Sequence, residues 1–178
     1  MRKLMLEGII RGVLTESAPS PDAAAIKELG VSLARTTRRR LGRSLSIREV
    51  DAGSCNGCEL EIHALNNAFY DIERFGLRFV ASPRHADVLL VTGPVTANMR
   101  VALERTYRAT PDPKWVVAVG DCGFDGGCFA GSYACVGGVS AVIPVDLHIK
   151  GCPPRPVDLL KGLIALVDHL DDSLLKRV

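Results

Sequence analysis

Two cysteines separated by two residues stand in residues 51–61, in a turn rich in glycine, serine and asparagine. The pair Cys55 and Cys58 can bind zinc or part of an iron–sulfur cluster, or can form a redox-active disulfide. Which chemistry applies depends on where further thiols lie. Cys122 and Cys152 stand far downstream, each beside a glycine and after an apolar stretch.

The elements that must position these cysteines can be read from the apolar pattern. Short valine- and leucine-rich segments alternate with helical patterns, which is typical of a parallel sheet covered on both faces. The predicted strands are 45–50, 78–81, 87–92, 114–119 and 141–149, the predicted helices are 58–75, 98–108 and 157–170, and residues 124–138 form a glycine-rich loop. We therefore predict a flavodoxin-like, doubly wound α/β domain with a parallel sheet.

The chain has 178 residues, of which 47% are hydrophobic, so it can bury one full core. We predict an α/β domain over residues 45–178, preceded by a helical, basic extension over 1–44. Helical patterns cover 4–14 and 23–41, separated by a break at 17–22. Residues 1–50 carry ten Lys/Arg and five Asp/Glu. This basic character suits a nucleic acid, an anionic membrane or an acidic partner, or simply a solvated helix face.

Composition argues against several classes of protein. Aromatic residues make up 5% of the chain, which disfavours a stacking platform for single-stranded nucleic acid. The sequence begins without a signal-peptide pattern, and its apolar runs are far shorter than a membrane span. The cysteine content is below that of a small secreted scaffold, so we expect a reducing compartment and no disulfide framework.

Ligand sites of open parallel sheets lie beyond the carboxyl ends of the strands. Cys55, Cys122 and Cys152 each follow a predicted strand, and Cys58 opens the helix after the first, so four thiols are expected at one edge. Four cysteines suit a structural zinc or a 4Fe-4S cluster. Zinc ribbons usually bind their metal with two close cysteine pairs, whereas this chain has one close pair and two isolated cysteines. This pattern disfavours zinc. A thioredoxin-like pair would leave Cys122 and Cys152 unexplained.

The remaining two cysteines, Cys128 and Cys135, lie in the predicted glycine-rich loop. Cysteine is often a small buried residue, and neither of these terminates a predicted strand. We expect both to be packing residues, with Cys128 close enough to Cys122 to substitute as a ligand. Six thiols do not suffice for two clusters of four cysteine ligands each, so we expect at most one cluster.

Four stretches carry a specific resemblance: Asp-Ala-Gly-Ser-Cys-Asn-Gly-Cys-Glu-Leu-Glu (51–61), Ser-Pro-Arg-His-Ala-Asp-Val-Leu-Leu-Val-Thr-Gly (82–93), Val-Gly-Asp-Cys (119–122) and Ile-Pro-Val-Asp-Leu-His-Ile-Lys-Gly-Cys-Pro-Pro-Arg-Pro (143–156). With them, residues 45–170 resemble the small, electron-transferring subunit of group 4 membrane-bound nickel–iron hydrogenases, the formate hydrogenlyase type. The same region is similar to the homologous cluster-binding 20 kDa subunit of respiratory complex I.

The resemblance implies that one 4Fe-4S cluster is bound by Cys55, Cys58, Cys122 and Cys152. It also implies an oxidoreductase complex whose active site, a nickel–iron centre, lies on a large catalytic subunit rather than on this chain. Electrons would leave through a ferredoxin-like iron–sulfur subunit, and membrane subunits would hold the complex at the cytoplasmic face of the cell membrane. We expect no nucleic-acid partner.

Two functions are possible within this family, that of a hydrogenase subunit and that of a complex I-like subunit. Complex I-type subunits typically have adjacent cysteines in the first motif, whereas this chain separates Cys55 from Cys58 by two residues, as hydrogenases do. The alternative is a complex I-like quinone oxidoreductase subunit carrying the terminal 4Fe-4S cluster. Outside the family, a structural zinc protein that uses the basic segment on nucleic acid remains open.

The chain departs from the family pattern in two places. Lys150 stands where the family is expected to have proline, and residues 1–44 lie outside the resemblance.

Two carboxylates follow the first cysteine pair. Glu59 and Glu61 could relay protons beside the cluster, facing the partner. As charges in the first helical turn they would instead stabilise the helix N-terminus. The sequence leaves both roles open.

Overall fold

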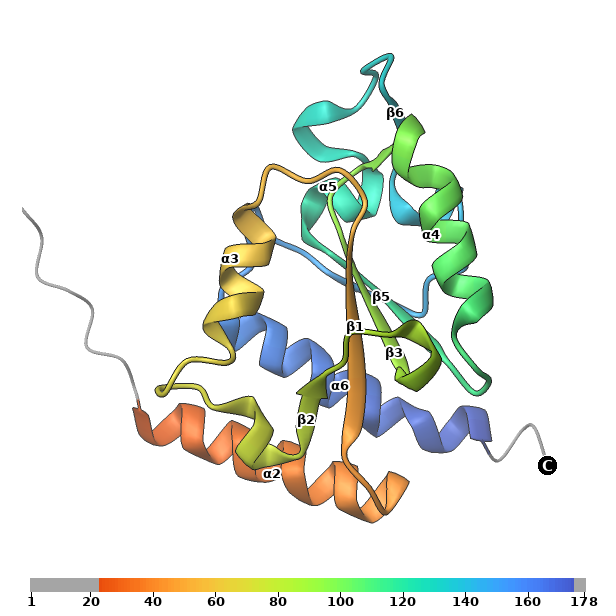
Figure 1. Ribbon diagram of the computed structural model, residues 1–178. Helices are drawn as coiled ribbons and strands as arrows, with labels where there is room; N and C mark the ends of the chain where they lie inside the picture. Colours follow the sequence, from red (N-terminus) through yellow and green to blue (C-terminus); the bar gives the residue numbers. More distant parts are fainter. Residues whose placement is uncertain (1–22, 175–178) are drawn as a thin grey trace, which may run out of the picture.

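The computed structural model describes residues 23–174 and contains a five-stranded parallel sheet (Figure 1). Its strand order is β2-β1-β3-β5-β7, and every pair of neighbours is parallel. The bounds are β1 Leu45–Asp51, β2 Leu77–Phe79, β3 Val88–Thr92, β5 Trp115–Val119 and β7 Leu147–Ile149. This order, with the first strand between the second and third, is that of flavodoxin-like sheets. The predicted fold class is confirmed.

Helices cover both faces of the sheet. The bounds are α2 Ala23–Leu41, α3 Gly57–Ala64, α4 Ala97–Ala109, α5 Gly120–Asp125 and α6 Pro156–Leu174. Short 3-10 turns occupy η1 Ile72–Phe75, η2 Pro83–His85, η3 Gly127–Phe129 and η4 Val139–Ala141. A small antiparallel pair, β4 Val95–Thr96 with β6 Cys135–Gly137, lies beyond the carboxyl end of the sheet.

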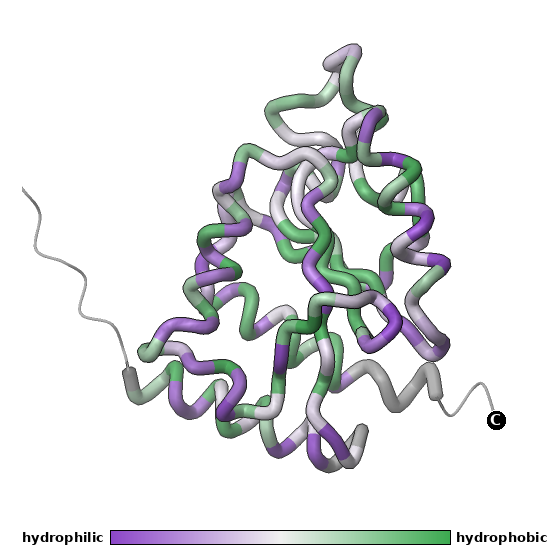
Figure 2. The backbone as a smooth tube through the Cα atoms, viewed as in Figure 1, coloured by the Kyte–Doolittle hydropathy of each residue, from purple (hydrophilic) through white to green (hydrophobic). Residues whose placement is uncertain are grey.

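The core lies in two layers because successive strand residues point to opposite faces. Leu90 of β3 packs with residues of α2, α3 and α6, whereas its neighbour Leu89 packs with Leu103 of α4. Both faces of the central strands are therefore apolar. Figure 2 colours the backbone of β3 and β5 mostly as hydrophobic. Full burial of each such side chain stabilises the fold by roughly 1.5–3 kcal/mol. This double burial accounts for the continuous apolar strands in the sequence.

Helix α2 packs along α6, and its Leu33 is fully buried in the core layer below the sheet. The described part of the predicted extension is thus joined to the α/β domain by apolar packing. The predicted helix over residues 4–14 lies outside the described residues. The domain boundary at residue 45 stays a prediction.

Three predicted elements are wrong in extent. The helix predicted over 58–75 ends at Ala64, because Oδ1 of Asn67 accepts the amides of Phe69 and Tyr70 at 2.9 and 3.0 Å and turns the chain. The strand predicted over 141–149 is reduced to β7, and the loop predicted over 124–138 contains the end of α5, η3 and β6. On α3 itself, the side chain of Leu60 is 61% exposed.

Asp87, directly before β3, connects the sheet to the segment that follows α2. Its Oδ1 accepts from Nη2 of Arg43 at 2.6 Å, and its Oδ2 accepts from Nη1 of Arg43 at 2.8 Å and from the amide of Ser46 at 2.9 Å. The carboxylate raises the pKa of Arg43, first through the side-chain hydrogen bond and then through its charge. One buried carboxylate thereby ties the segment before β1 to the start of β3.

We expect Asp87→Ala to lower the free energy of unfolding by about 2–4 kcal/mol, because the substitution removes three hydrogen bonds to a buried, charged acceptor. Urea unfolding of the full chain measures this loss. Glu104→Ala is the control, since it breaks only an exposed ion pair with Arg100 and should cost no more than about 0.5 kcal/mol. Equal losses in the two variants would contradict this role for Asp87.

Candidate metal centre

The first cysteine pair is presented by a turn at the end of β1. Oδ1 of Asp51 accepts hydrogen bonds from the amides of Gly53 and Ser54 at 2.7 and 2.8 Å, which closes the turn. Asn56 then takes a left-handed conformation, with φ of 70°, and starts α3 at the next residue. This local geometry leaves Cys55 exposed in the turn. Cys58, the second residue of α3, is buried.

Helix α5, which carries Cys122, and the loop that carries Cys152 are tied to each other. The amide of Gly151 donates to Oδ1 of Asp121 at 2.9 Å, and the amide of Asp121 donates to the Gly151 carbonyl at 3.0 Å. Asp121 directly precedes Cys122, and Gly151 directly precedes Cys152. The reciprocal pair therefore sets the separation of Cys122 and Cys152.

A glycine brings the first loop against the other two. Gly120 has φ of +81°, and a Cβ built on it would lie 2.8 Å from Sγ of Cys58 and 3.3 Å from the Gly151 carbonyl oxygen. A Cβ on Gly57 would lie 3.6 Å from Sγ of Cys55 and 3.8 Å from Pro153, the residue after Cys152. The segments that follow β1, β5 and β7 therefore meet at one edge of the sheet, as the strand-end pattern predicted.

The electrostatics of the cysteines follow from this convergence. The pKa of the Cys58 thiol is raised to about 12. Burial is the largest cause, and the charges of Glu59 and of the other three cysteines, Cys122, Cys55 and Cys152, add to it. Burial first, and then the neighbouring Cys128, raises the pKa of Cys122 to about 11. Without added positive charge these thiols keep their protons. A bound metal supplies that charge and converts them to thiolate ligands.

Between residues 23 and 174, no three His, Cys, Asp or Glu side chains stand close enough together to share one metal ion. A 4Fe-4S cluster attaches each of four cysteines to a different iron, so its ligands surround the cluster instead of meeting at one point. Four thiols on three converging loops, with a glycine surface beneath Sγ of Cys58, suit such a group. The assignment of these four residues as ligands stays a prediction.

Two carboxylates interact near the first cysteine pair: Glu59, which directly follows Cys58 in α3, and Glu49 of β1. Glu59 is 6% exposed, and neither of its carboxylate oxygens has a hydrogen-bond partner within the described part of the chain. Glu49 of β1 is half-buried, and its pKa is raised by burial first and also by the charge of Glu59, against the lowering effect of His63. Nε2 of His63 stands 3.9 Å from Oε2 of Glu49.

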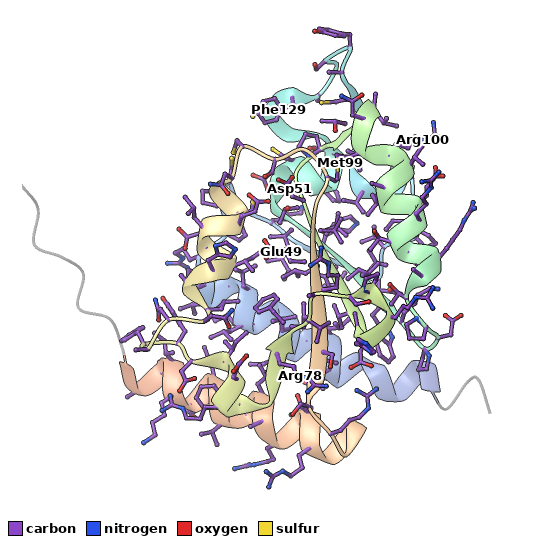
Figure 3. The ribbon with its side chains drawn as sticks, in the orientation of Figure 1. Glu49, Asp51, Arg78, Met99, Arg100 and Phe129 are labelled. Carbon is purple, nitrogen blue, oxygen red and sulfur yellow. The ribbon has the colours of Figure 1, made fainter. Side chains whose placement is uncertain are left out.

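Glu49 is a site residue that the sequence did not reveal. Figure 3 shows it on β1 below Asp51, with Phe129 at the same end of the molecule as Asp51 and Arg78 at the opposite end. Its place in an alternating strand pattern is that of an ordinary surface residue. Only the fold brings β1 and α3 close enough for the charges of Glu49 and Glu59 to interact.

Other residues of the resembling stretches have structural partners. Arg155 pairs with Asp158 at 2.9 Å, and Oδ2 of Asp146 accepts the amide of Val116 at 2.7 Å. The ring of His148 packs edge-on against Phe124, with centroids 4.9 Å apart, and burial lowers its pKa. His85 is exposed in η2.

The two additional cysteines differ from the expectation of buried packing residues. Cys128 is exposed in η3, and Cys135 is half-buried in β6, opposite Thr96. The expectation was wrong because the segment from 126 to 137 folds over the edge of the sheet and not into its core. After burial, the neighbouring Cys128 is the next cause that raises the pKa of Cys122.

Comparison with known proteins extends this picture. Residues 55–166 match the family model described as NADH ubiquinone oxidoreductase, 20 Kd subunit. The chain is 40% identical to formate hydrogenlyase subunit 7 of Escherichia coli over 157 residues, covering 88% of this chain and 62% of that protein. It thus spans less than two thirds of the length of that relative. It is 46% identical over 130 residues to a probable membrane-bound hydrogenase subunit of Pyrococcus furiosus, covering 73% of this chain and 78% of the relative.

A solved structure agrees with these relatives. A chain of the membrane-bound sulfane sulfur reductase, an archaeal respiratory membrane complex, superposes with a TM-score of 0.66 at 35% identity, over 79% of this chain and 76% of that one. These relatives are subunits of membrane-bound hydrogenase or respiratory complexes. Over residues 23–174, no helix has the length and apolar character needed to span a bilayer. From the family match and these identities, the chain belongs to the family of the 20 kDa subunit of NADH ubiquinone oxidoreductase.

Proposed function

We propose that this chain is the electron-transfer subunit of a multisubunit, membrane-associated nickel–iron hydrogenase. The observation that carries the proposal is the meeting of three cysteine-bearing loops around Gly120, in a chain of this family. Cys55, Cys58, Cys122 and Cys152 would hold one 4Fe-4S cluster. When bound, such a cluster supplies one-electron transfer at a potential set by its surroundings.

The chain's own residues would fix the ligands and exclude water around them. The reciprocal hydrogen bonds of Asp121 and Gly151 hold two of the loops, and Asp51 closes the third. Sγ of Cys58 lies over the bare Cα of Gly120, so the backbone can approach the thiolates closely.

A large catalytic subunit would cover this edge. Five large apolar side chains are exposed on the elements that carry the cysteines or on the segment that follows them: Leu60, Phe124, Phe129, Tyr133 and Val136. Tyr133 is fully exposed, and such apolar surface around a site is typical of a protein–protein interface. We infer that the nickel–iron centre lies on that partner, while a ferredoxin-like subunit and membrane subunits complete the complex at the cytoplasmic face of the membrane.

The complex I-like alternative, in which electrons pass to quinone, is favoured by the description of the matching family. The hydrogenase proposal is favoured by the Pyrococcus furiosus relative, a probable membrane-bound hydrogenase subunit. The purified complex, supplied with a chemically reduced one-electron carrier, separates the two. Hydrogen evolution supports the hydrogenase proposal. Quinone reduction without hydrogen evolution would overturn it in favour of the alternative.

Glu59 is the residue of this chain proposed to pass protons at the interface, because its carboxylate is buried beside the cysteines and has no fixed partner among the described residues. We expect Glu59→Gln in the complex to slow hydrogen evolution by on the order of 100-fold while the iron content stays unchanged. Glu61→Gln, on the same helix but more exposed, is the control and should retain most activity. Full activity of Glu59→Gln would leave Glu59 with a helix-terminus role alone.

A further inference from the structure

A basic cavity lies at the amino ends of β1 and β2, at the edge of the sheet opposite the cysteines. Its volume is about 370 Å³, and its walls are the last turns of α2, the segment before β1, and η1 with the residue before β2. Figure 1 shows α2 and β2 at the end of the molecule away from α5 and β6. Three arginines line the cavity, Arg38, Arg43 and Arg74. The proposed electron-transfer function uses none of them.

Two left-handed glycines shape the walls of this cavity. Gly42 has φ of +66°, and its amide donates to the Arg38 carbonyl at 3.1 Å at the end of α2. Gly76 has φ of +84°, and its amide donates to the Glu73 carbonyl at 3.0 Å at the end of η1. The Gly76 carbonyl then accepts the amide of Leu45 at 2.9 Å. Because Leu45 begins β1, this bond joins two of the walls.

Two of the three guanidinium groups are held by neighbours and still reach solvent. Nη1 and Nη2 of Arg43 donate to Asp87 at 2.8 and 2.6 Å, yet the side chain is 61% exposed and these bonds use only part of its donors. Cζ of Arg74 lies 4.8 Å from the ring centroid of the buried Phe75. Oδ2 of Asp71 stands 3.6 Å from Nε of Arg74, which is too far for a hydrogen bond. Both arginines can therefore donate to a ligand.

The charge of the cavity favours an anion. Among the described residues its lining carries three guanidinium groups and one carboxylate, that of Glu73. Asp87 balances the charge of Arg43, so Arg43 contributes donors, while Arg38 and Arg74 supply the positive charge. The C-terminal end of α2 adds a partial negative charge of only about half an elementary charge. The total stays positive.

We propose that this cavity binds a phosphate group, either that of inorganic phosphate or that of a phospholipid headgroup. Three guanidinium groups around one cavity suit an anion with several oxygen atoms, because a guanidinium can donate two parallel hydrogen bonds. Thr37 lines the same cavity, and its buried hydroxyl has no hydrogen-bond partner in the described part of the chain. A phosphate oxygen would accept from that hydroxyl and satisfy it. This ligand site is separate from the proposed cluster and does not depend on it.

The test measures binding of the full chain to two probes, inorganic phosphate by isothermal titration calorimetry and vesicles of phosphatidylcholine with phosphatidylglycerol by cosedimentation. We expect Arg38→Gln and Arg74→Gln each to weaken binding by on the order of 10-fold, the loss that follows from removing one charge-assisted hydrogen bond. Glu73→Gln removes the opposing carboxylate and should strengthen binding by about 2- to 5-fold. The control is Arg105→Gln, which removes the same charge from an exposed position on α4, across the sheet, and should bind like wild type.

Either probe can support the proposal. Binding of inorganic phosphate that Arg38→Gln and Arg74→Gln weaken identifies a site for the free anion, and the same pattern with vesicles alone identifies a lipid headgroup. No binding of either probe by wild type would overturn the proposal. Equal affinity of Arg105→Gln and Arg74→Gln would overturn it too, because binding would then not depend on the cavity. Since Glu73→Gln is expected to gain affinity, misfolding of a variant cannot imitate that result.

Discussion

Cys58→Ala is expected to remove the cluster from the complex. Cys58 is the buried member of the first pair, and its sulfur lies over Gly120, where the three loops meet. A methyl group in its place has no lone pair for iron, and three remaining cysteines leave one iron without a protein ligand. We expect iron bound to this chain to fall from about four per molecule to well below one. Metal analysis of the anaerobically purified complex measures this.

The metal-free fold should tolerate that change better than the cluster does, since replacing one sulfur by hydrogen in the core costs on the order of 1 kcal/mol. Cys135→Ala is the matched control, because it removes a thiol from the same edge of the molecule outside the predicted ligand set. It should keep its full iron content. A Cys58→Ala complex that also keeps full iron would remove Cys58 from the ligand set.

Gly120→Ala should have the second large effect, without altering any cysteine. An alanine there must hold φ near +81° and place its Cβ 2.8 Å from Sγ of Cys58. The left-handed conformation costs about 1–2 kcal/mol for a residue with a Cβ, and displacing the packed sulfur adds about 1–2 kcal/mol. We expect unfolding of the chain in urea to show both costs, and iron content to fall because Cys58 is displaced.

Gly131→Ala separates the two contributions. Gly131 has a similar φ of +79°, but a Cβ on it meets nothing within 4 Å. This control should lose only about 1–2 kcal/mol and keep its iron. If Gly120→Ala loses no more stability than Gly131→Ala and also keeps its iron, the contact between Gly120 and Cys58 has no role in holding the site.

The central strands could be predicted because burial on both faces demands continuous apolar residues, as in β3 and β5. The helix after the first cysteine pair was predicted too long, since the side chain of Asn67 ends the helical path through hydrogen bonds that periodicity does not reveal. The last strand was also predicted too long. Ile143 is buried by packing with Val139 and the face of the sheet covered by α4, not by pairing within the sheet.

The edge of the sheet at which the cysteines meet followed from the position of each one after a strand. What holds them together there did not. The reciprocal bonds of Asp121 and Gly151, and the contact of Cys58 with Gly120, join loops that are distant in the chain. Glu49 escaped notice for the same reason, because its charge interacts with that of Glu59 only through tertiary packing.

The central claim is that these loops hold one 4Fe-4S cluster beside a nickel-containing partner. Its most direct test is the iron, sulfide, nickel and zinc content of the anaerobically purified native complex, with electron paramagnetic resonance of the reduced form. We predict about four irons and four sulfides on this chain, a cluster signal on reduction, and nickel on the large subunit. Iron without nickel would contradict the hydrogenase assignment, and zinc in place of iron would contradict the cluster itself.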